Sequence, residues 1–322
     1  MQRRKFLTTS TALLGALPFI PAHSFNSFKT TSFMDAEIVK IQIGKINCTF
    51  FRDLMFKYLA KDFFINANRE ELDQSLHKYH IAPDNIPSLF IALLLQYNDK
   101  KVLIDTGVGF SEKPIMASDQ PIFWKGRLQQ LLQQENIKKE EITDVIITHF
   151  HPDHIGGVYS DDGLLNFPKA RFHTNEDEWN YWHSSASDNQ PELFKNFIEK
   201  NVTKLKDLDL QFCKGDSTEI LPGITAIKVE GHTPGQIALD IHSGNEHLLY
   251  IADAFLHPLH IEKLDWQTIY DHDHEKAKQS RIKLLELAYK NNMLVNAFHF
   301  DFPGLGRIDK LNDNWAWKYT DK

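Results

Sequence analysis

Apolar positions along the chain fall into short alternating or continuous runs that predict strands, and into longer helical patterns. Residues 37–51 alternate apolar and polar positions, which predicts two strands joined by a turn. Residues 89–95 and 102–104 are continuous apolar runs separated by a short polar turn, which predicts a hairpin of buried strands. Residues 52–85 are mixed and charged, and we expect a loop with short helical pieces there, serving as a lid or a subunit contact.

Strands and helices interleave through the rest of the chain. The same patterns predict further strands at residues 145–148, 170–173, 224–229, 236–241, 248–251 and 294–298, and amphipathic helices at residues 121–135, 176–183, 192–205 and 275–290. Hairpins occur in both halves, and no linker divides residues 36–322. This order predicts one α+β domain with two mixed β-sheets covered by helices, and argues against a single parallel sheet.

The composition is that of a globular protein with ample material for a large core. Of the 322 residues, 42% are hydrophobic and 25% are charged, and the formal net charge is −7. No basic run follows the N-terminus, which argues against nucleic acid as a partner. Cys48 and Cys213 do not form a metal-type pair such as C-x-x-C, and we expect two buried free thiols, with a disulfide between them as the alternative in an oxidising compartment.

The N-terminus has the pattern of an export signal. Arg3, Arg4 and Lys5 precede an apolar run, and small residues follow by Ser24. The two arginines indicate twin-arginine export of residues 1–24, with an ordinary secretory signal as the alternative. We expect residues 25–35 to be a flexible lead-in. The mature protein is then periplasmic or extracellular, with no stable membrane insertion.

Potential metal ligands are most concentrated in the run from Thr148 to Gly157, at the end of the predicted strand at residues 145–148. They are His149, His151, Asp153 and His154. Alternate residues of an extended segment face one side, so the first two histidines can share one ion. The second pair, one turn later, can face another. This order predicts two adjacent metal ions.

Three later residues each follow a predicted buried strand, as His149 does. They are His232 within Gly231-His-Thr-Pro-Gly235, Asp253, and His299. Strand ends at one edge of a sheet are where residues distant in sequence converge on one site. Nitrogen and carboxylate ligands without thiolate suit zinc, and also manganese, iron or cobalt.

These motifs, in this order and at these separations, resemble the metallo-β-lactamase superfamily. The resemblance implies its four-layer αβ/βα sandwich, with the two sheets packed face to face and helices outside. The segment from Phe298 to Gly306 resembles the branch that includes methyl parathion hydrolase and lactonase-like exported hydrolases. The ligands implied for the first metal are His149, His151 and His232, those for the second are Asp153, His154 and His299, and Asp253 bridges the two.

The resemblance further implies a hydrolase in which hydroxide shared by two divalent ions, most simply zinc, cleaves a lactone, ester or organophosphate triester. Asp153 and Asp253 are the candidate catalytic carboxylates, and Asp105 is expected to orient a ligand imidazole. β-Lactamase, thioester hydrolase and non-catalytic metal-binding activity stay open as alternatives. A small molecule is the expected substrate, and a homodimer is a further expectation. Candidate pocket residues are Trp182, Leu256, Phe123 and Phe302.

Overall fold

The first of two large sheets contains the N-terminal half of the fold. The computed structural model describes residues 36–83, 85–111, 115–117, 120–312 and 314–320. The first four strands pair antiparallel and the last three join in parallel, so the sheet is mixed. In spatial order its strands are β1 (Ile38–Ile43), β2 (Ile46–Tyr58), β3 (Ile86–Tyr97), β4 (Lys100–Ile104), β7 (Asp144–Ile146), β8 (Arg171–Asn175) and β9 (Leu210–Cys213).

The second sheet contains the C-terminal half and is also mixed. Its neighbours pair antiparallel except for β13 and β14, which run parallel because a helix crosses between them. In spatial order the strands are β10 (Ser217–Leu221), β11 (Ile224–Lys228), β12 (Ile237–Ser243), β13 (Glu246–Tyr250), β14 (Leu294–Asn296), β15 (Leu305–Leu311) and β16 (Asn314–Tyr319). A separate hairpin joins β5 (Ile115–Ala117) to β6 (Gln120–Ile122).

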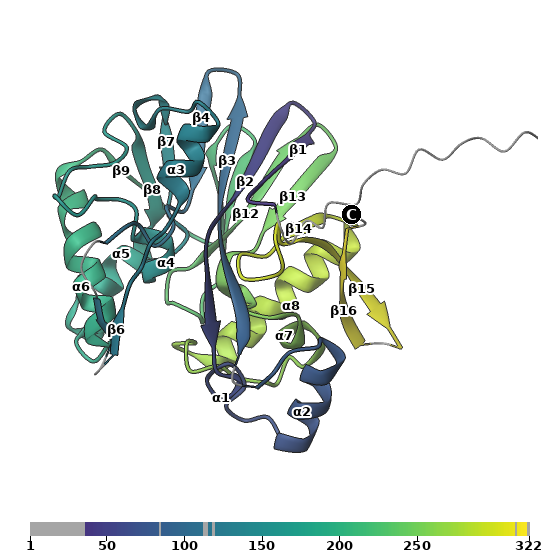
Figure 1. The fold of residues 1–322 in the computed structure, drawn as a ribbon. Coiled ribbons are helices and arrows are strands. Elements are labelled where there is room, and N and C mark those ends of the chain that lie inside the picture. The colour runs from purple at the N-terminus through teal and green to yellow at the C-terminus, as the bar shows by residue number, and fades with distance from the viewer. Residues whose placement is uncertain (1–35, 84, 112–114, 118–119, 313, 321–322) are drawn as a thin grey trace, which may run out of the picture. The chain divides into compact units, whose positions relative to one another are not determined.

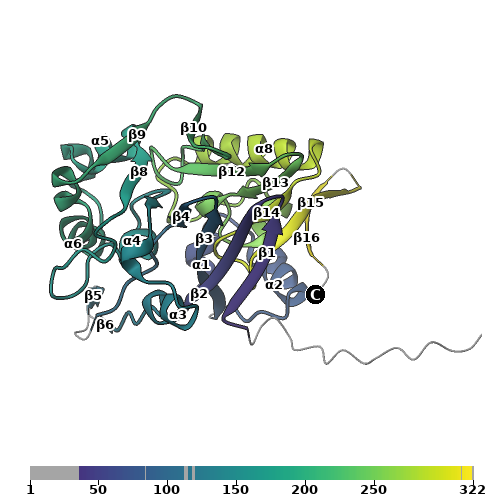
Figure 2. The same cartoon turned by 90° about the horizontal axis from the view of Figure 1, so that it is seen from above.

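Side-chain alternation along the strands divides the core into layers. On β13, Leu248 and Tyr250 face the core shared with the first sheet, whereas Leu249 packs with Leu284 and Leu285 of α8 (His274–Lys290). Figure 1 and Figure 2 show α8 along the second sheet and the helices α3 to α6 beside the first. Those helices are α3 (Leu128–Gln134), α4 (Pro152–Ile155), α5 (Glu176–Trp182) and α6 (Glu192–Asn201). The predicted four-layer sandwich is confirmed.

Residues 52–85 differ in part from the predicted loop. Strand β2 continues to Tyr58, past a register shift between Arg52 and Leu54 that interrupts the alternation. Asp53 turns inward at this bulge, where its carboxylate accepts from the backbone N–H groups of Val108 at 2.9 Å and Leu128 at 2.7 Å. The short helices α1 (Ala60–Phe63) and α2 (Arg69–Lys78) follow, and they pack against α7 (Pro258–Glu262) and the segment after it.

The helix predicted at residues 121–135 is wrong in its first half. The helix α3 begins only at Leu128, because Gly126 donates its N–H to the carbonyl of Gly109 at 2.8 Å. A Cβ at residue 126 would lie 2.6 Å from that carbonyl oxygen, so the chain passes too closely for a helix to start earlier. Apolar periodicity alone does not detect such a close backbone approach.

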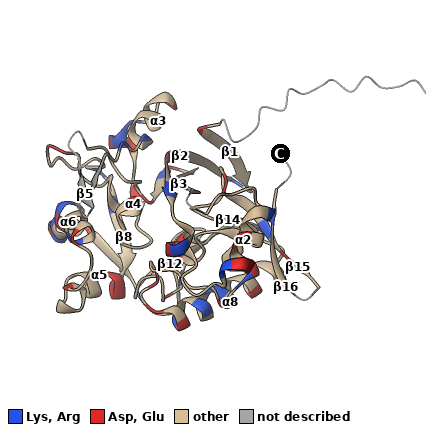
Figure 3. Cartoon of the chain, turned by 60° about the horizontal axis from the view of Figure 1, so that its bottom comes forward, with Lys and Arg blue, Asp and Glu red and all other residues tan. Residues whose placement is uncertain are grey.

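Other sequence predictions concern the cysteines, the charges and the N-terminus. Cys48 and Cys213 are both buried and free, as expected. Figure 3 shows basic and acidic residues mixed along α2, α6 and α8. Within the described ranges, no helix is long and apolar enough to cross a membrane. The predicted export signal and lead-in lie outside the described residues.

Candidate metal centre

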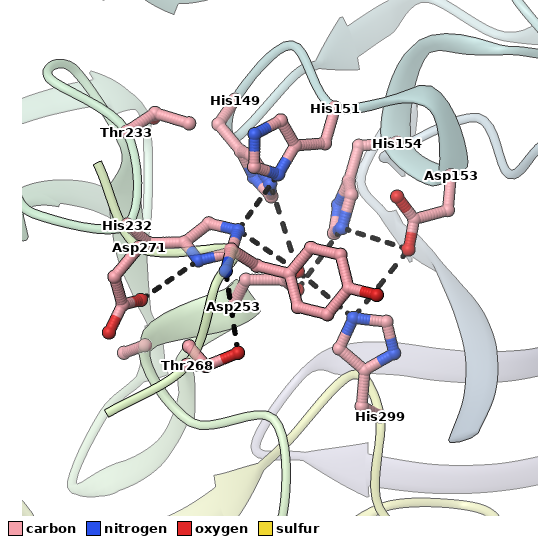
Figure 4. Close-up of polar contacts among 12 residues, drawn as sticks. His149, His151, Asp153, His154, His232, Thr233, Asp253, Thr268, Asp271 and His299 are labelled. Atoms are coloured by element: carbon pink, nitrogen blue, oxygen red, sulfur yellow. Dashed lines mark hydrogen bonds and ion pairs between the residues drawn. The ribbon is translucent and has the colours of Figure 1, made fainter. Parts of the chain in front are cut away.

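Four segments bring the seven candidate ligands to the same edge of the two sheets. The run from His149 to α4 follows β7, the loop with His232 joins β11 to β12, and Asp253 and His299 follow β13 and β14. Figure 4 shows the seven side chains pointing toward one another. All are buried, with no more than 7% of any residue exposed. The convergence expected from the strand ends is therefore present in the structure.

The donor atoms form two groups that share Asp253. Within each group the atoms lie no more than 4.8 Å apart. One group contains His149, His151, His232 and Asp253, and the other contains Asp153, His154, Asp253 and His299. This is the division that the resemblance implied for two ions.

The carboxylate of Asp253 lies between the histidines of both groups. Its Oδ2 is 3.4 Å from Nε2 of His232 and 2.9 Å from Nε2 of His299. Its Oδ1 is 3.1 Å from Nε2 of His154. A carboxylate that contacts histidines of both groups in this way can bridge two ions.

Several buried atoms at the centre have no hydrogen-bond partner among the described residues, and this observation tests the fit of metal ions. They are Nε2 of His149, and Nε2 of His154 and Oδ1 of Asp253, which lie 3.1 Å apart without hydrogen-bond geometry. Such atoms are costly to bury unless something binds them. The ion pairs of Asp153 and Asp253 with described residues are all with histidines, so none of these pairs brings a lysine or arginine to balance the two carboxylates. The donor set therefore fits divalent cations, and the role of each residue as a ligand stays a prediction.

The imidazole pKa values follow from burial and from the carboxylates. Burial lowers the pKa of His149 and His151 well below the ordinary value, which keeps both rings neutral, as metal ligation requires. Burial also opposes protonation of His154 and His232, but the aspartates around them outweigh it. They raise the pKa of His154 well above its usual range and that of His232 to about 9. The carboxylates thus attract positive charge to these positions.

Hydrogen bonds at the opposite ring nitrogens hold three of the imidazoles with Nε2 toward the centre. Nδ1 of His154 lies 2.8 Å from Asp105, Nδ1 of His299 lies 2.8 Å from the hydroxyl of Ser88, and Nδ1 of His232 lies 3.2 Å from Asp271. Partners of this kind orient metal-binding histidines. The contact expected of Asp105 is present, whereas the contacts of Ser88 and Asp271 were not predicted from the sequence.

Asp271 forms a buried ion pair behind His232. Its carboxylate accepts from the guanidinium of Arg281 at 2.8 Å, and both side chains are no more than 2% exposed. Burial raises the pKa of Asp271, but Arg281 and then His232 outweigh that effect and hold the pKa well below its usual range. The aspartate therefore stays charged and can accept a hydrogen bond from Nδ1–H of His232.

Glu178 is a further buried carboxylate that sequence reasoning passed over. It joins the two loops of the first ligand group, accepting from the N–H of Phe150 at 2.8 Å and from the hydroxyl of Thr233 at 2.6 Å. It also accepts from the N–H of Gly235 at 3.0 Å and the indole of Trp182 at 2.7 Å. The available signal was its position on the predicted helix at residues 176–183, where Glu178 shares the inward-facing side with Trp182.

A cavity of about 220 Å³ opens onto the centre. His151, Asp153, His232, Asp253 and His299 form its floor. Its walls are mostly aromatic and aliphatic, and the wall residues are Phe56, Tyr58, Phe63, Trp124, Pro152, Leu193, Phe194, Leu256 and Tyr270.

Of the four predicted pocket residues, one lines the cavity and three do not. Leu256 lines the cavity. Trp182 lies behind the wall, with its ring centroid 6.3 Å from that of His151, and donates to Glu178. Phe123 is 55% exposed and Phe302 is 3% exposed within the core, and neither lines the cavity. The tertiary fold decides whether an aromatic side chain is buried and whether it points into the cavity, and the spacing of residues in the sequence does not reveal this.

The fold and this centre define a metal-dependent hydrolase. The chain belongs to the metallo-beta-lactamase superfamily, whose family model matches residues 91–291. The superfamily predicted from the motifs is thus confirmed, together with its lactonase-like branch.

Similar proteins include named lactonases. An N-acyl homoserine lactonase of Bacillus cereus is 26% identical over 254 residues, which cover 74% of this chain and 92% of that protein. A solved structure of AidC, a dizinc quorum-quenching lactonase in complex with the product N-hexanoyl-L-homoserine, has a TM-score of 0.77 at 27% identity and covers 88% of this chain and 98% of that one. The hydrolase AbOPH has a TM-score of 0.78 at 22% identity, over 89% of this chain and 98% of that one, and shows the shared fold.

Proposed function

We propose that this protein is a dinuclear metal hydrolase that opens the ring of a lactone carrying an apolar chain, an N-acyl homoserine lactone being the leading candidate. The observation that carries the proposal is the buried centre with two ligand groups at the floor of an aromatic cavity. The named lactonases among its relatives support the lactone as substrate. None of the described residues that line the cavity is lysine or arginine, which favours an uncharged substrate.

The first ligand group would hold one ion and the second the other, with Asp253 between them. A pair of divalent ions, which we propose to be zinc, supplies Lewis acidity that polarises a carbonyl and lowers the pKa of water toward neutrality. Ser88, Asp105 and Asp271 keep the imidazoles fixed, so that the donor atoms need no rearrangement.

Asp153 is the candidate proton carrier. It lines the cavity, and its Oδ2 lies 3.5 Å from Nε2 of His299. Burial raises the pKa of Asp153 above its ordinary value in the metal-free centre. When the lactone ring opens, the departing alkoxide needs a proton, and Asp153 could take that proton from the attacking water and pass it to the alkoxide oxygen.

Tyr58 and Tyr270 are candidate hydrogen-bond donors to the substrate. Their rings meet edge to face with centroids 5.5 Å apart, and both line the cavity. Burial raises the pKa of both phenols, so they are protonated at neutral pH. Each hydroxyl can donate to a carbonyl or amide oxygen of the substrate. Phe63 and Phe194 extend the apolar wall and can bind the acyl chain.

The test is a substrate panel with metal-stripped protein reloaded with zinc. The panel contains N-acyl homoserine lactones of different chain length, simple lactones, aryl esters, phosphotriesters, nitrocefin and a glutathione thioester. We expect lactones to be turned over with the highest kcat/KM. Asp253→Asn should be inactive, whereas Asp309→Asn, which alters a surface pair with Lys318, should retain activity. Faster turnover of any other substrate class, or no turnover of lactones, would overturn the proposal.

We also propose that residues 1–24 direct export. The support is the sequence pattern of two arginines before a short apolar run. Fractionation of cells that produce the full chain should find the protein outside the cytoplasm, and Arg3→Lys with Arg4→Lys should retain it inside if the twin-arginine route is used. Cytoplasmic location of the unmodified chain would contradict export.

A further inference from the structure

Three metal-binding side chains meet on the β12–β13 hairpin, away from the candidate metal centre. His242 of β12 lies directly opposite His247 of β13, and Asp240 is two residues before His242 on the same strand. Alternate residues of a strand share a face, so all three project from one side of the sheet. One donor atom from each lies within 4.8 Å of the other two.

This group is separate from the main centre. Ala238 and Leu249, which share its face, pack under α8, whereas Ile241 and Leu248 point into the core between the sheets. The group is therefore on the outer face of the second sheet. It also lies toward the end of β12 that is remote from the loop with His232.

The contacts within the group leave donor atoms available. Oδ1 of Asp240 lies 2.9 Å from Nδ1 of His247. The rings of His242 and His247 are stacked, with centroids 5.5 Å apart and an interplanar angle of 23°. Nδ1 of His242 is buried and has no hydrogen-bond partner among the described residues. The ion pairs of the described residues give Asp240 no lysine or arginine partner.

We propose that Asp240, His242 and His247 bind a third divalent transition-metal ion, of the class of Zn²⁺ or Cu²⁺. Two imidazoles and one carboxylate are a ligand set that suits these ions, and three protein ligands leave the remaining coordination for solvent. The side chains of His247 and Asp240 are 36% and 22% exposed, so an ion can enter directly from solution. The bound ion links the two strands on either side of the hairpin turn.

Such an ion would bind more weakly than the pair at the main centre. The main centre is buried and has seven ligands, whereas this site has three and is open to solvent. Occupation of the third site should therefore follow that of the first two as the zinc concentration rises. It should stabilise the fold without changing hydrolysis, because it lies on the outer face of the second sheet, toward the end of β12 that is remote from the loop with His232.

The experiment is equilibrium dialysis of the full-length protein against buffered micromolar Zn²⁺, followed by metal analysis. The wild type should hold one zinc ion per chain more than His242→Asn/His247→Asn. Zinc added beyond the first two equivalents should raise the unfolding temperature of the wild type but not of the variant. Substrate turnover by the two proteins, each loaded with two equivalents, should be equal.

The matched control is His77→Asn/His80→Asn, which removes two neighbouring imidazoles with centroids 6.4 Å apart that lie outside any of the described ligand groups. It should bind as much zinc as the wild type. If the first double variant does not fold, Asp240→Asn replaces it, with an expected loss of at least about tenfold in affinity for the third ion. Equal zinc content in wild type and hairpin variant, or an equal loss in the control, would overturn the proposal. These outcomes concern zinc binding and are independent of which substrate the enzyme hydrolyses.

Discussion

Replacement of Glu178 by glutamine tests whether the loops of the first ligand group are held in place from behind. The carboxylate accepts four hydrogen bonds, two at each oxygen. Glutamine can keep one oxygen toward Phe150 and Trp182, but its NH₂ group then faces Thr233 and Gly235. The threonine hydroxyl can rotate to accept from this NH₂, whereas the N–H of Gly235 cannot.

The expected cost follows from that single unsatisfied amide. A buried hydrogen-bond donor left without a partner lowers the free energy of unfolding by about 1–3 kcal/mol. For a domain of this size, each kcal/mol lowers the unfolding temperature by about 2–4 °C. Because Phe150 lies between His149 and His151, and Thr233 follows His232, the loops that carry three ligands should also loosen. We expect zinc affinity to fall by about tenfold or more.

Two measurements check this reasoning, thermal unfolding of the metal-free protein and zinc competition with a chelating dye. The matched control is Asp177→Asn on the same helix, since Asp177 is 53% exposed and pairs with Lys228 at the surface. Surface pairs contribute about 0–1 kcal/mol, so the control should stay close to wild type. If Glu178→Gln matched the control in both measurements, Glu178 would not position the ligand loops.

Three further results are expected. Asp271→Asn should destabilise the protein by about 3–5 kcal/mol, because it leaves the Arg281 guanidinium buried without its anion. Since the folded-state pKa of Asp271 is depressed, the stabilisation by its charge is present above pH about 4 and is lost as the pH falls below that value. The difference in free energy of unfolding between wild type and variant, measured in urea, should therefore shrink in acid, and a difference that grew would contradict this reasoning. Tyr58→Phe and Tyr270→Phe should each lower kcat/KM on a lactone by roughly 2–10-fold, the worth of one neutral hydrogen bond, and equal rates for all three proteins would exclude the phenols as donors. Removal of metal by a chelator should abolish hydrolysis and lower the unfolding temperature, with both restored by zinc, and undiminished activity of the stripped protein would refute a metal mechanism.

The sequence was informative about the centre because its ligands obey a local rule. Each follows a buried apolar strand, and this placement predicted that His149, His232, Asp253 and His299 would meet. The strands before the last three run the same way in the second sheet and end at one edge, whereas β7 before His149 belongs to the first sheet, which packs against the second. The structure brings them together, and their ligand roles stay a prediction. The partners behind them were not predicted, because Ser88 and Asp271 lie in segments whose contact with an imidazole depends on the tertiary fold.

The two wrong secondary-structure predictions share a cause, which is a local exception to a repeating pattern. The bulge at Asp53 shifts the alternation of β2 by one residue, so the pattern beyond it does not predict the strand that the structure has. The helix α3 starts late because Gly126 passes against Gly109. In both places a backbone contact with a distant segment outweighs the preference of the local sequence.

The course of β2 beyond the bulge also explains why the metal-ligand motifs did not predict the substrate. Beyond Asp53, β2 runs on to place Phe56 and Tyr58 in the cavity wall, and α1 adds Phe63. None of these residues belongs to a ligand loop, and the helices that follow β2 pack on α7 and its neighbours. The wall can therefore vary in sequence while the centre stays the same. We therefore expect the substrate range of this protein to depend on residues 54–63 and the loops opposite, and its reactivity to depend on the residues at the strand ends.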